Sequence, residues 1–255
     1  MNAATERTLR VVAPVVVGLL LLALWYLLVD VVQLAPKALP GPLAVAEQFG
    51  GNLGIIWKGA AITSLNALVG LLLGTVLAII AAALAAWARP IDGAFAPVVA
   101  MIAVVPIVAL TPIFNTMFGA SSQYGRQLVA AIAAFVPVYL NVLRGLRQAR
   151  PVQRDLFAAY AASGGQTFRK LTLPTAVPHL FTGVRIASSL AVISALVAEY
   201  FGGPSDGVGT AIATYAKSGR AALAFAFVGA AIVVGLVFFL ATALVERLVT
   251  RRLPG

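Results

Sequence analysis

Few residues in this sequence could carry out covalent chemistry. It has no cysteine, one histidine (His179) and only eight Asp and Glu residues, which are scattered along 255 positions. A metal site or a hydrolytic centre needs several such side chains close together. No Gly-Lys-Ser or Gly-Lys-Thr sequence, as a phosphate-binding loop requires, occurs either. We therefore predict a chain that is not an enzyme and binds no cofactor, so that any ATP hydrolysis serving it takes place in another chain.

Three polar residues lie among apolar ones and are candidates for a role without covalent chemistry. Glu199 follows a long, mostly apolar run, and an ionisable group inside a membrane is a functional candidate by default. It could take part in gating a pathway, or it could be structural. Asn115 and Asn141 could likewise line a pathway or bond neighbouring helices.

The composition indicates which elements position these residues. Apolar residues make up 61% of the chain and charged residues 10%, against about 45–50% and about 25% in soluble domains. So little polar surface could not cover a soluble core. We predict an all-α fold, a polytopic transmembrane bundle of about six spans, because roughly 20 residues cross a bilayer. The predicted spans are residues 11–33, 60–88, 93–118, 127–146, 177–199 and 222–246.

The third predicted span is the least regular, because it contains Pro97, Pro106 and Pro112. Proline removes a helical hydrogen bond and bends or breaks the helix. In a membrane such a break persists only where protein or water satisfies the freed backbone groups. We therefore expect this span, with Pro106, near a pathway inside the bundle, or else as a kinked packing helix.

The basic residues predict the orientation. The net charge is +10, but Lys and Arg lie mainly between apolar segments, so we interpret them as a topology signal and not as a nucleic-acid surface. With the N-terminus in the cytoplasm, most of them fall on the cytoplasmic side. The outer side then receives only Lys37, Lys58, Arg126, Lys217 and Arg220. The positive-inside rule thus predicts both termini in the cytoplasm, with anionic lipid of the bilayer as a further contact.

A long cytoplasmic stretch at roughly 147–176 separates the fourth and fifth spans, and two short helices are expected within it at 151–174. We expect a first helix from Pro151, ended by Gly164-Gly165, and a second at about Thr167–Leu173, ended by Pro174. Two short helices with an apolar side could dock into a groove on a partner protein. Alternatively they could lie flat at the lipid headgroups, held by their basic residues.

This stretch resembles the cytoplasmic loop of binding-protein-dependent ABC importer permeases, which usually reads Glu-Ala-Ala, then Gly, then Pro at fixed spacing. Aligned on Leu173-Pro174, the acidic position falls on Asp155 and the glycine position on Ala161. Residues 166–174 match the family closely, whereas the first half matches poorly, and Gly164-Gly165 could shift the turn. Similar stretches occur at 63–65, 106–119, 135–141, 183–187 and 197–209. The branch it resembles most serves sulfonates, taurine, nitrate and pyrimidine precursors.

The resemblance implies a type I importer fold. Two permease subunits, in a homodimer or heterodimer, would line a path, and two ABC ATPase subunits holding ATP-Mg would grip the loop. A binding protein outside the cytoplasmic (inner) membrane would deliver a small solute. The chain would divide into an anchor and external segment (1–59), a permease core (60–246) and a basic tail (247–255). The implied ATPase-coupling residues are Asp155, Ala158, Ala161, Gly164, Gly165, Phe168, Arg169, Leu173 and Pro174, and the pathway candidates are Pro106, Asn115, Asn141 and Glu199.

Two other functions are alternatives. A secondary transporter driven by an ion gradient usually needs ionisable residues near the membrane midplane, and this sequence has almost none there. A non-transporting membrane scaffold needs no such residues. The permease interpretation is favoured over both, because of the resemblance of the 151–174 stretch and the other segments to that family.

Overall fold

The computed structural model describes residues 3–33, 39–202 and 206–251, and within these ranges it contains helices and no strands. The predicted outer residue Lys37 and positions 252–255 of the predicted tail lie outside the described residues. The elements in chain order are α1 (Ala3–Tyr26), η1 (Leu27–Val31), α2 (Pro42–Gly51), α3 (Leu53–Trp87), α4 (Arg89–Val104), α5 (Ile107–Phe118), α6 (Tyr124–Arg147), α7 (Pro151–Ala159), α8 (Gly164–Thr167), η2 (Phe168–Thr172), α9 (Leu173–Phe201), α10 (Val208–Lys217) and α11 (Ala221–Thr250).

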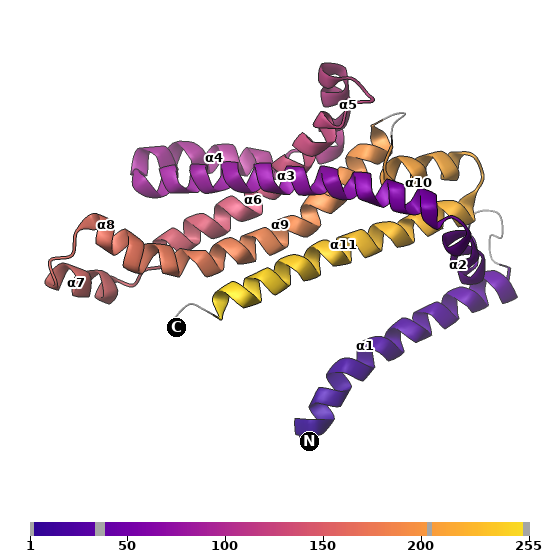
Figure 1. Ribbon diagram of the computed structural model, residues 1–255, viewed down its shortest axis with the longest axis horizontal. Coiled ribbons are helices and arrows are strands. Elements are labelled where there is room, and N and C mark those ends of the chain that lie inside the picture. Colours follow the sequence, from indigo (N-terminus) through magenta and orange to yellow (C-terminus); the bar gives the residue numbers. More distant parts are fainter. Residues whose placement is uncertain (1–2, 34–38, 203–205, 252–255) are drawn as a thin grey trace.

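The long helices confirm the predicted all-α membrane bundle. In the described part of the chain, five helices are long and apolar enough to cross a membrane, and a bent pair, taken as one span, brings the number to six. The long helices α3, α6, α9 and α11 run side by side along the molecule (Figure 1). We refer to its two ends as the α7 end, where α7 and α8 lie, and the α10 end, where α2 and α10 lie.

The bent pair is the predicted irregular span. Residues Pro90–Val104 and Ile107–Phe118 meet at 93°, with Val105 and Pro106 between them in extended conformation (ψ 124° and 109°). A residue that precedes proline is pushed out of the helical region by the proline ring, so Val105 ends α4. As a result α4 lies along α3, whereas α5 projects from the bundle near the α10 end (Figure 1).

Small residues let the central helices α3, α6 and α9 approach closely. A Cβ atom on Gly70 would lie 2.8 Å from the carbonyl oxygen of Gln127, and one on Gly74 would lie 3.0 Å from the Cβ of Ala134. Both positions therefore allow α3 to pack directly on α6. Alanine fills most of the rest of this core: Ala67, Ala78, Ala82, Ala130, Ala134, Ala187, Ala191 and Ala195 are at most 1% exposed.

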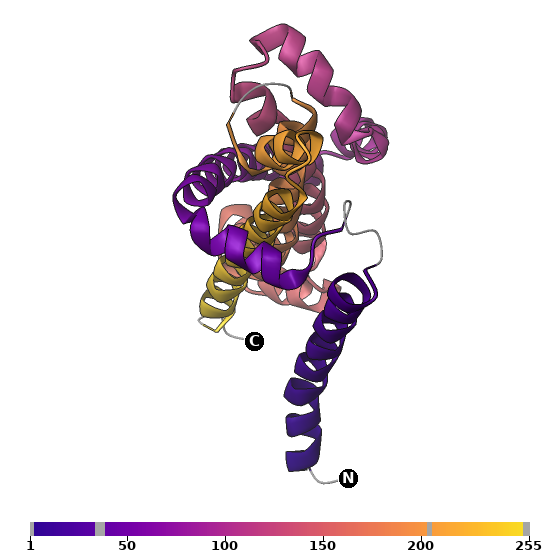
Figure 2. The same cartoon turned by 90° about the vertical axis from the view of Figure 1, so that its right-hand side faces the viewer.

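Helix α1 stands apart from the other long helices. In both views it slants away from the bundle and approaches it only near α2 (Figures 1 and 2). Only 6% of the span Val12–Val31 is buried. Its apolar side chains therefore depend on lipid or on another chain for cover.

Candidate functional site

Helix α7 begins where the sequence predicts it, at Pro151, and projects at the α7 end (Figure 1). Pro151 suits the first turn because the helix needs no N–H bond there. The Gln153 side chain also accepts a hydrogen bond from the Arg150 backbone N–H at 3.0 Å. The helix start is thus locally stabilised, without support from the bundle.

The end of α7 corrects the sequence prediction. The helix ends before Ala161, not at Gly164-Gly165, and Ala161 takes the left-handed φ of +52°. The N–H groups of Ala161 and Ala162 bond back to the carbonyls of Ala158 (2.9 Å) and Phe157 (3.0 Å). These two bonds form a Schellman cap. Ala161 therefore takes the left-handed cap position that the family pattern gives to glycine. For a residue with a Cβ this conformation costs about 1–2 kcal/mol.

Gly164 and Gly165 begin the next helix instead. Ser163 precedes them, its hydroxyl accepts from the Gln166 N–H (3.3 Å), and its own N–H donates to the Gln166 side chain (2.8 Å). This reciprocal pair is a capping box, which marks a helix start. The Ser-x-x-Gln signal at 163–166 outweighs the breaking tendency of the two glycines.

Pro174 does not end the second helix, which is a further correction. Residues Phe168–Thr172 form a turn of π-helix, and the Leu173 N–H donates to the Phe168 carbonyl. Proline lacks an N–H and collides with the carbonyl four residues back in an α-helix, and the wider turn before Pro174 changes that register. Residues Gly164–Phe201 are consequently one continuous helix of 38 residues.

The predicted coupling residues lie together at the α7 end on an exposed surface. Val152 and Leu156 of α7 and Tyr160 directly after it are 77%, 55% and 80% exposed, although all are large and apolar or aromatic. Of the predicted set, only Pro174 is half-buried; the exposed members are Asp155, Ala158, Ala161, Gly164, Gly165, Phe168, Arg169 and Leu173. Exposed apolar side chains on a projecting helix form a surface suited to a partner.

At the α10 end, Glu199 is completely buried. Its carboxyl oxygens accept hydrogen bonds from Thr63 Oγ1 (2.7 Å), Asn66 Nδ2 (3.2 Å) and the Gly209 backbone N–H (3.0 Å). Thr63 in turn accepts from the Val208 N–H at 2.9 Å. At the start of α10, the Val208 N–H is therefore linked to Glu199 through Thr63, and the Gly209 N–H is bonded to it directly. The positive end of a helix dipole favours a carboxylate at this place. The carboxyl joins α3, α9 and α10.

A chain of polar side chains extends from this carboxyl into α6. Asn66 also donates to Gln123 Oε1 (2.8 Å), which accepts from Arg126 Nη1 at 2.9 Å. Arg126, predicted to lie on the outer side, is only 1% exposed, and its Nη2 donates to the Ala120 carbonyl (3.1 Å). We call Thr63, Asn66, Gln123, Arg126 and Glu199 the Glu199 cluster.

The remaining pathway candidates are only partly brought together. Asn115 of α5 donates to the carbonyl of Gly202, just after α9 (3.0 Å), so it ties the broken span to the helix that carries Glu199. Asn141 donates to the Pro137 carbonyl within its own helix (2.7 Å). Pro106 forms the corner between α4 and α5.

Sequence reasoning missed Thr63 and Asn66 as partners of Glu199, and Arg126 as a further member of the Glu199 cluster. Thr63 and Asn66 are polar residues three positions apart in a mostly apolar stretch, so they share one helix face. That spacing was an available signal for a buried polar contact. The sequence contained no comparable signal for Arg126, because a residue at the end of a span is equally compatible with solvent.

Comparisons with known proteins agree with this architecture. Residues 74–253 match the family described as binding-protein-dependent transport system inner membrane component. The riboflavin transport system permease protein RibX of Chloroflexus aurantiacus is 31% identical over 91% of this chain and 87% of its own length. The formylaminopyrimidine transport permease protein ThiX of Halalkalibacterium halodurans is 28% identical over 80% and 81%.

The fold also resembles a solved structure. A chain of the methionine ABC transporter MetNI, in inward-facing conformations, superposes with a TM-score of 0.65 at 19% identity, covering 78% of this chain and 97% of that one. This likeness concerns the fold, whereas the family match covers residues 74–253, from the middle of α3 to the end of α11. The chain therefore belongs to the family of inner-membrane permease components of binding-protein-dependent ABC transport systems.

Proposed function

We propose that this chain is the non-catalytic membrane subunit of an ATP-driven importer and that residues 151–174 dock onto a separate ATPase. The observation that carries the proposal is the exposed apolar side of α7, next to a helix that runs unbroken from Gly164 to Phe201. A partner that moves α7 and α8 would move α9 with them. Rigid helices of this kind can convert a partner's motion into rotation of the spans.

The orientation follows from the charges. The α7 end is the cytoplasmic end, because basic residues gather there: Arg144, Arg147, Arg150, Arg154, Arg169, Lys170, Arg247 and Arg251. Both termini then lie in the cytoplasm, and the α10 end faces outward. Two ATPase subunits bind ATP-Mg and engage this chain and a second permease, which is a copy of it or a related chain.

The transport path runs beside the broken span. Pro106 sets the direction of α5, and Asn115 anchors α5 to Gly202. Asn141 and Glu199 complete the set of path residues, with Glu199 acting from behind the path wall because it is fully enclosed. Closure of the ATPase pair switches the path between its two sides, and no cofactor is bound by this chain itself.

The substrate is a small solute such as a sulfonate, taurine, nitrate, a carboxylate or a pyrimidine-like compound, delivered by an external binding protein. Exposed Lys58, Lys217 and Arg220 at the outer end favour an anion through long-range attraction. The relatives named for riboflavin and formylaminopyrimidine favour a heterocycle. Thermal shift of the cognate binding protein with taurine, nitrate, riboflavin and a formylaminopyrimidine distinguishes these classes.

The docking proposal is tested by cysteine crosslinking, for which the chain is well suited because it has no cysteine. Ala158→Cys and Ala161→Cys should crosslink to the ATPase that copurifies with the chain. Ala216→Cys, an exposed alanine of α10 at the opposite end, is the matched control and should not. Crosslinks from Ala158→Cys only to lipid or to a second copy, or a chain that never retains an ATPase, would contradict the proposal.

A further inference from the structure

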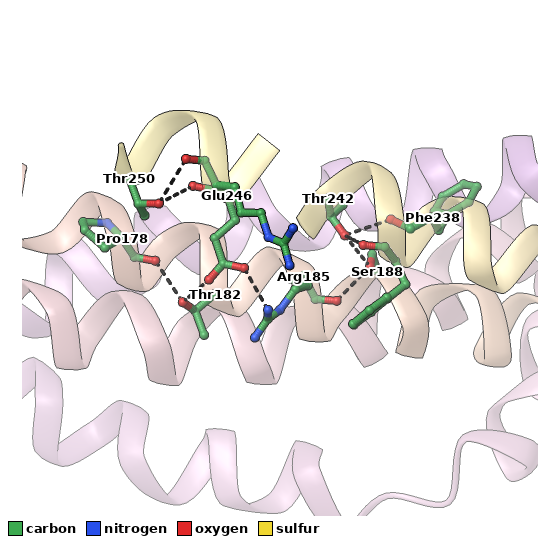
Figure 3. A network of polar contacts seen from close by, with 10 residues as sticks. Pro178, Thr182, Arg185, Ser188, Phe238, Thr242, Glu246 and Thr250 are labelled. Carbon is green, nitrogen blue, oxygen red and sulfur yellow. Dashed lines mark hydrogen bonds and ion pairs between the residues drawn. The ribbon is translucent and has the colours of Figure 1, made fainter. Parts of the chain in front are cut away.

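A ladder of polar contacts joins α9 to α11 in the half of the bundle nearer the α7 end (Figure 3). Arg185 Nη1 pairs with Glu246 Oε2 at 3.2 Å, and the other Glu246 oxygen accepts from Thr182 Oγ1 at 2.7 Å. Ser188 and Thr242 are hydroxyl to hydroxyl at 3.0 Å. The sequence showed Arg185 inside a span without identifying its partner.

The spacing places these side chains on facing sides of the two helices. Positions 182, 185 and 188 of α9 recur every three residues, and 242 and 246 of α11 are four apart, so each set lies on one helix face. Figure 3 shows the two sets pointing toward each other. Arg185 also lies over the ring of Phe239, 5.9 Å from its centre. Its guanidinium therefore contacts α11 at both Phe239 and Glu246.

The ion pair differs in kind from the contacts around it. The neighbouring contacts of Thr182 and Ser188 are hydrogen bonds from single hydroxyl groups, whereas the Arg–carboxylate contact is charged on both sides and directional. A charged group inside a span is also costly unless it is paired. Separating Arg185 from Glu246 is therefore unfavourable, and the pair holds α11 in register with α9. The Glu246 side chain is 15% exposed and that of Arg185 37%, so the pair is only partly shielded from its surroundings.

We propose that Arg185 and Glu246 are positioning residues that make α11 follow α9 during the transport cycle. The inference rests on the proposed function of residues 151–174, because α9 is the direct continuation of that segment. Movement imposed at α8 reaches α9 through the helix backbone. It then reaches α11 through the Arg185–Glu246 pair, with Thr182 orienting the carboxylate. In this way, movement of the docking segment 151–174 is passed on to two spans, α9 and α11.

The test uses the complex of this chain with its ATPase in lipid nanodiscs, with one spin label per sample. Ile186→Cys reports on α9 and Leu248→Cys on α11, since both positions are exposed (44% and 51%). Spectra are compared without nucleotide and after trapping with ATP and vanadate. In the unaltered background both labels should respond. With Arg185→Gln or Glu246→Gln, the α9 label should still respond while the α11 response is lost.

Three further variants separate positioning from general damage. Arg185→Lys keeps the charge and should retain the α11 response, and the exchange R185E/E246R should restore part of it. Arg247→Gln removes an exposed charge next to Glu246 on the same helix and should leave both labels responsive. An α11 response that persists in both neutralised variants overturns the inference alone. Failure of the α9 label to respond in the unaltered background contradicts the proposed function itself.

Discussion

The two ends of α9 are held in different ways. Near the α10 end, Glu199 is fully enclosed and bonded to Thr63, Asn66 and the start of α10. Toward the α7 end, α9 is joined to α11 by a partly exposed ion pair and continues into a segment whose apolar side chains face outward. A hydrogen-bonded buried network rigidifies its surroundings, whereas an exposed surface is available to a partner. The two ends of α9 therefore combine buried polar contacts with an exposed apolar surface.

Single glycines also separate packed positions from open ones. Gly70 leaves no room for a Cβ because α6 lies against it, whereas Gly164 and Gly165 have nothing within 4 Å of that position. Changes at Glu199 or Gly70 should thus act on stability, and changes on the exposed surface of 151–174 on partner binding. Four experiments test this division.

The largest effect is expected from Glu199→Ala. It leaves the Thr63 hydroxyl, the Asn66 amide and the Gly209 N–H without their acceptor in a buried site, at a cost of about 3 kcal/mol in unfolding free energy. Thermal unfolding of the purified chain in detergent measures it. Glu47→Ala, at an exposed position of α2, is the control and should change little. An unfolding temperature equal to that of the parent would show that the hydrogen bonds of Glu199 do not stabilise the fold.

Leu156→Asp should produce the next largest effect, on binding instead of folding. The side chain is 55% exposed, so its replacement should leave thermal unfolding almost unchanged. Binding of the ATPase should weaken roughly 30-fold, about 2 kcal/mol, as for a central interface residue. Copurification and titration of the ATPase onto the chain in nanodiscs measure it. Loss of stability without loss of binding would reverse the proposed division.

A pair of glycine substitutions compares the two ends directly. Gly70→Ala should cost about 2 kcal/mol, because the added Cβ overpacks the contact with Ala130 and the Gln127 carbonyl. Gly164→Ala makes the same chemical change in open space and should alter stability by less than about 1 kcal/mol. Thermal unfolding in the same detergent compares them. Equal losses of stability in the two variants would mean that α3 and α6 can move apart to accommodate the added methyl group at little cost.

The smallest effect is expected from Ala161→Gly. Glycine relieves the left-handed strain of this residue but is more flexible in the unfolded chain, so the net gain is about 0.5 kcal/mol. Hydrogen exchange of the Ala162 amide, which bonds the Phe157 carbonyl in the cap, should slow about twofold for this free-energy change. Faster exchange would show that Ala161 is not strained.

Much of the bundle could be predicted from local sequence. An irregular third span was predictable because proline acts on its own residue and its neighbour. Which of its three prolines breaks the helix was not, since Pro97 and Pro112 lie inside helices and only Pro106 separates two. The end of α7 was not, because several cap signals lie within a few positions and compete. Ser163 with Gln166 prevailed over Gly164-Gly165, and the cap at Ala161 placed an alanine where glycine is usual. Pro174 was misread because the π turn before it could not be inferred from the pattern.

The polar contacts between helices were harder to predict than the helix ends. Glu199 was recognisable as a candidate, but its partner Thr63 is 136 positions away, and the partner of Arg185 is in another span. Residue types and periodicity say which face of a helix is polar. They do not say which other helix lies opposite that face.

By itself the sequence determined that the bilayer is the solvent, the approximate number of spans, the irregular third span and the position of the two-helix segment at 151–174. These follow from transfer free energies and local backbone preferences, which add up along the chain. Only the tertiary structure decided that Glu199 closes a network over α3 and α10 and that Arg185 meets Glu246. Hydrogen bonds and ion pairs form only within a narrow range of distance and angle. Helix packing alone decides which side chains come within that range.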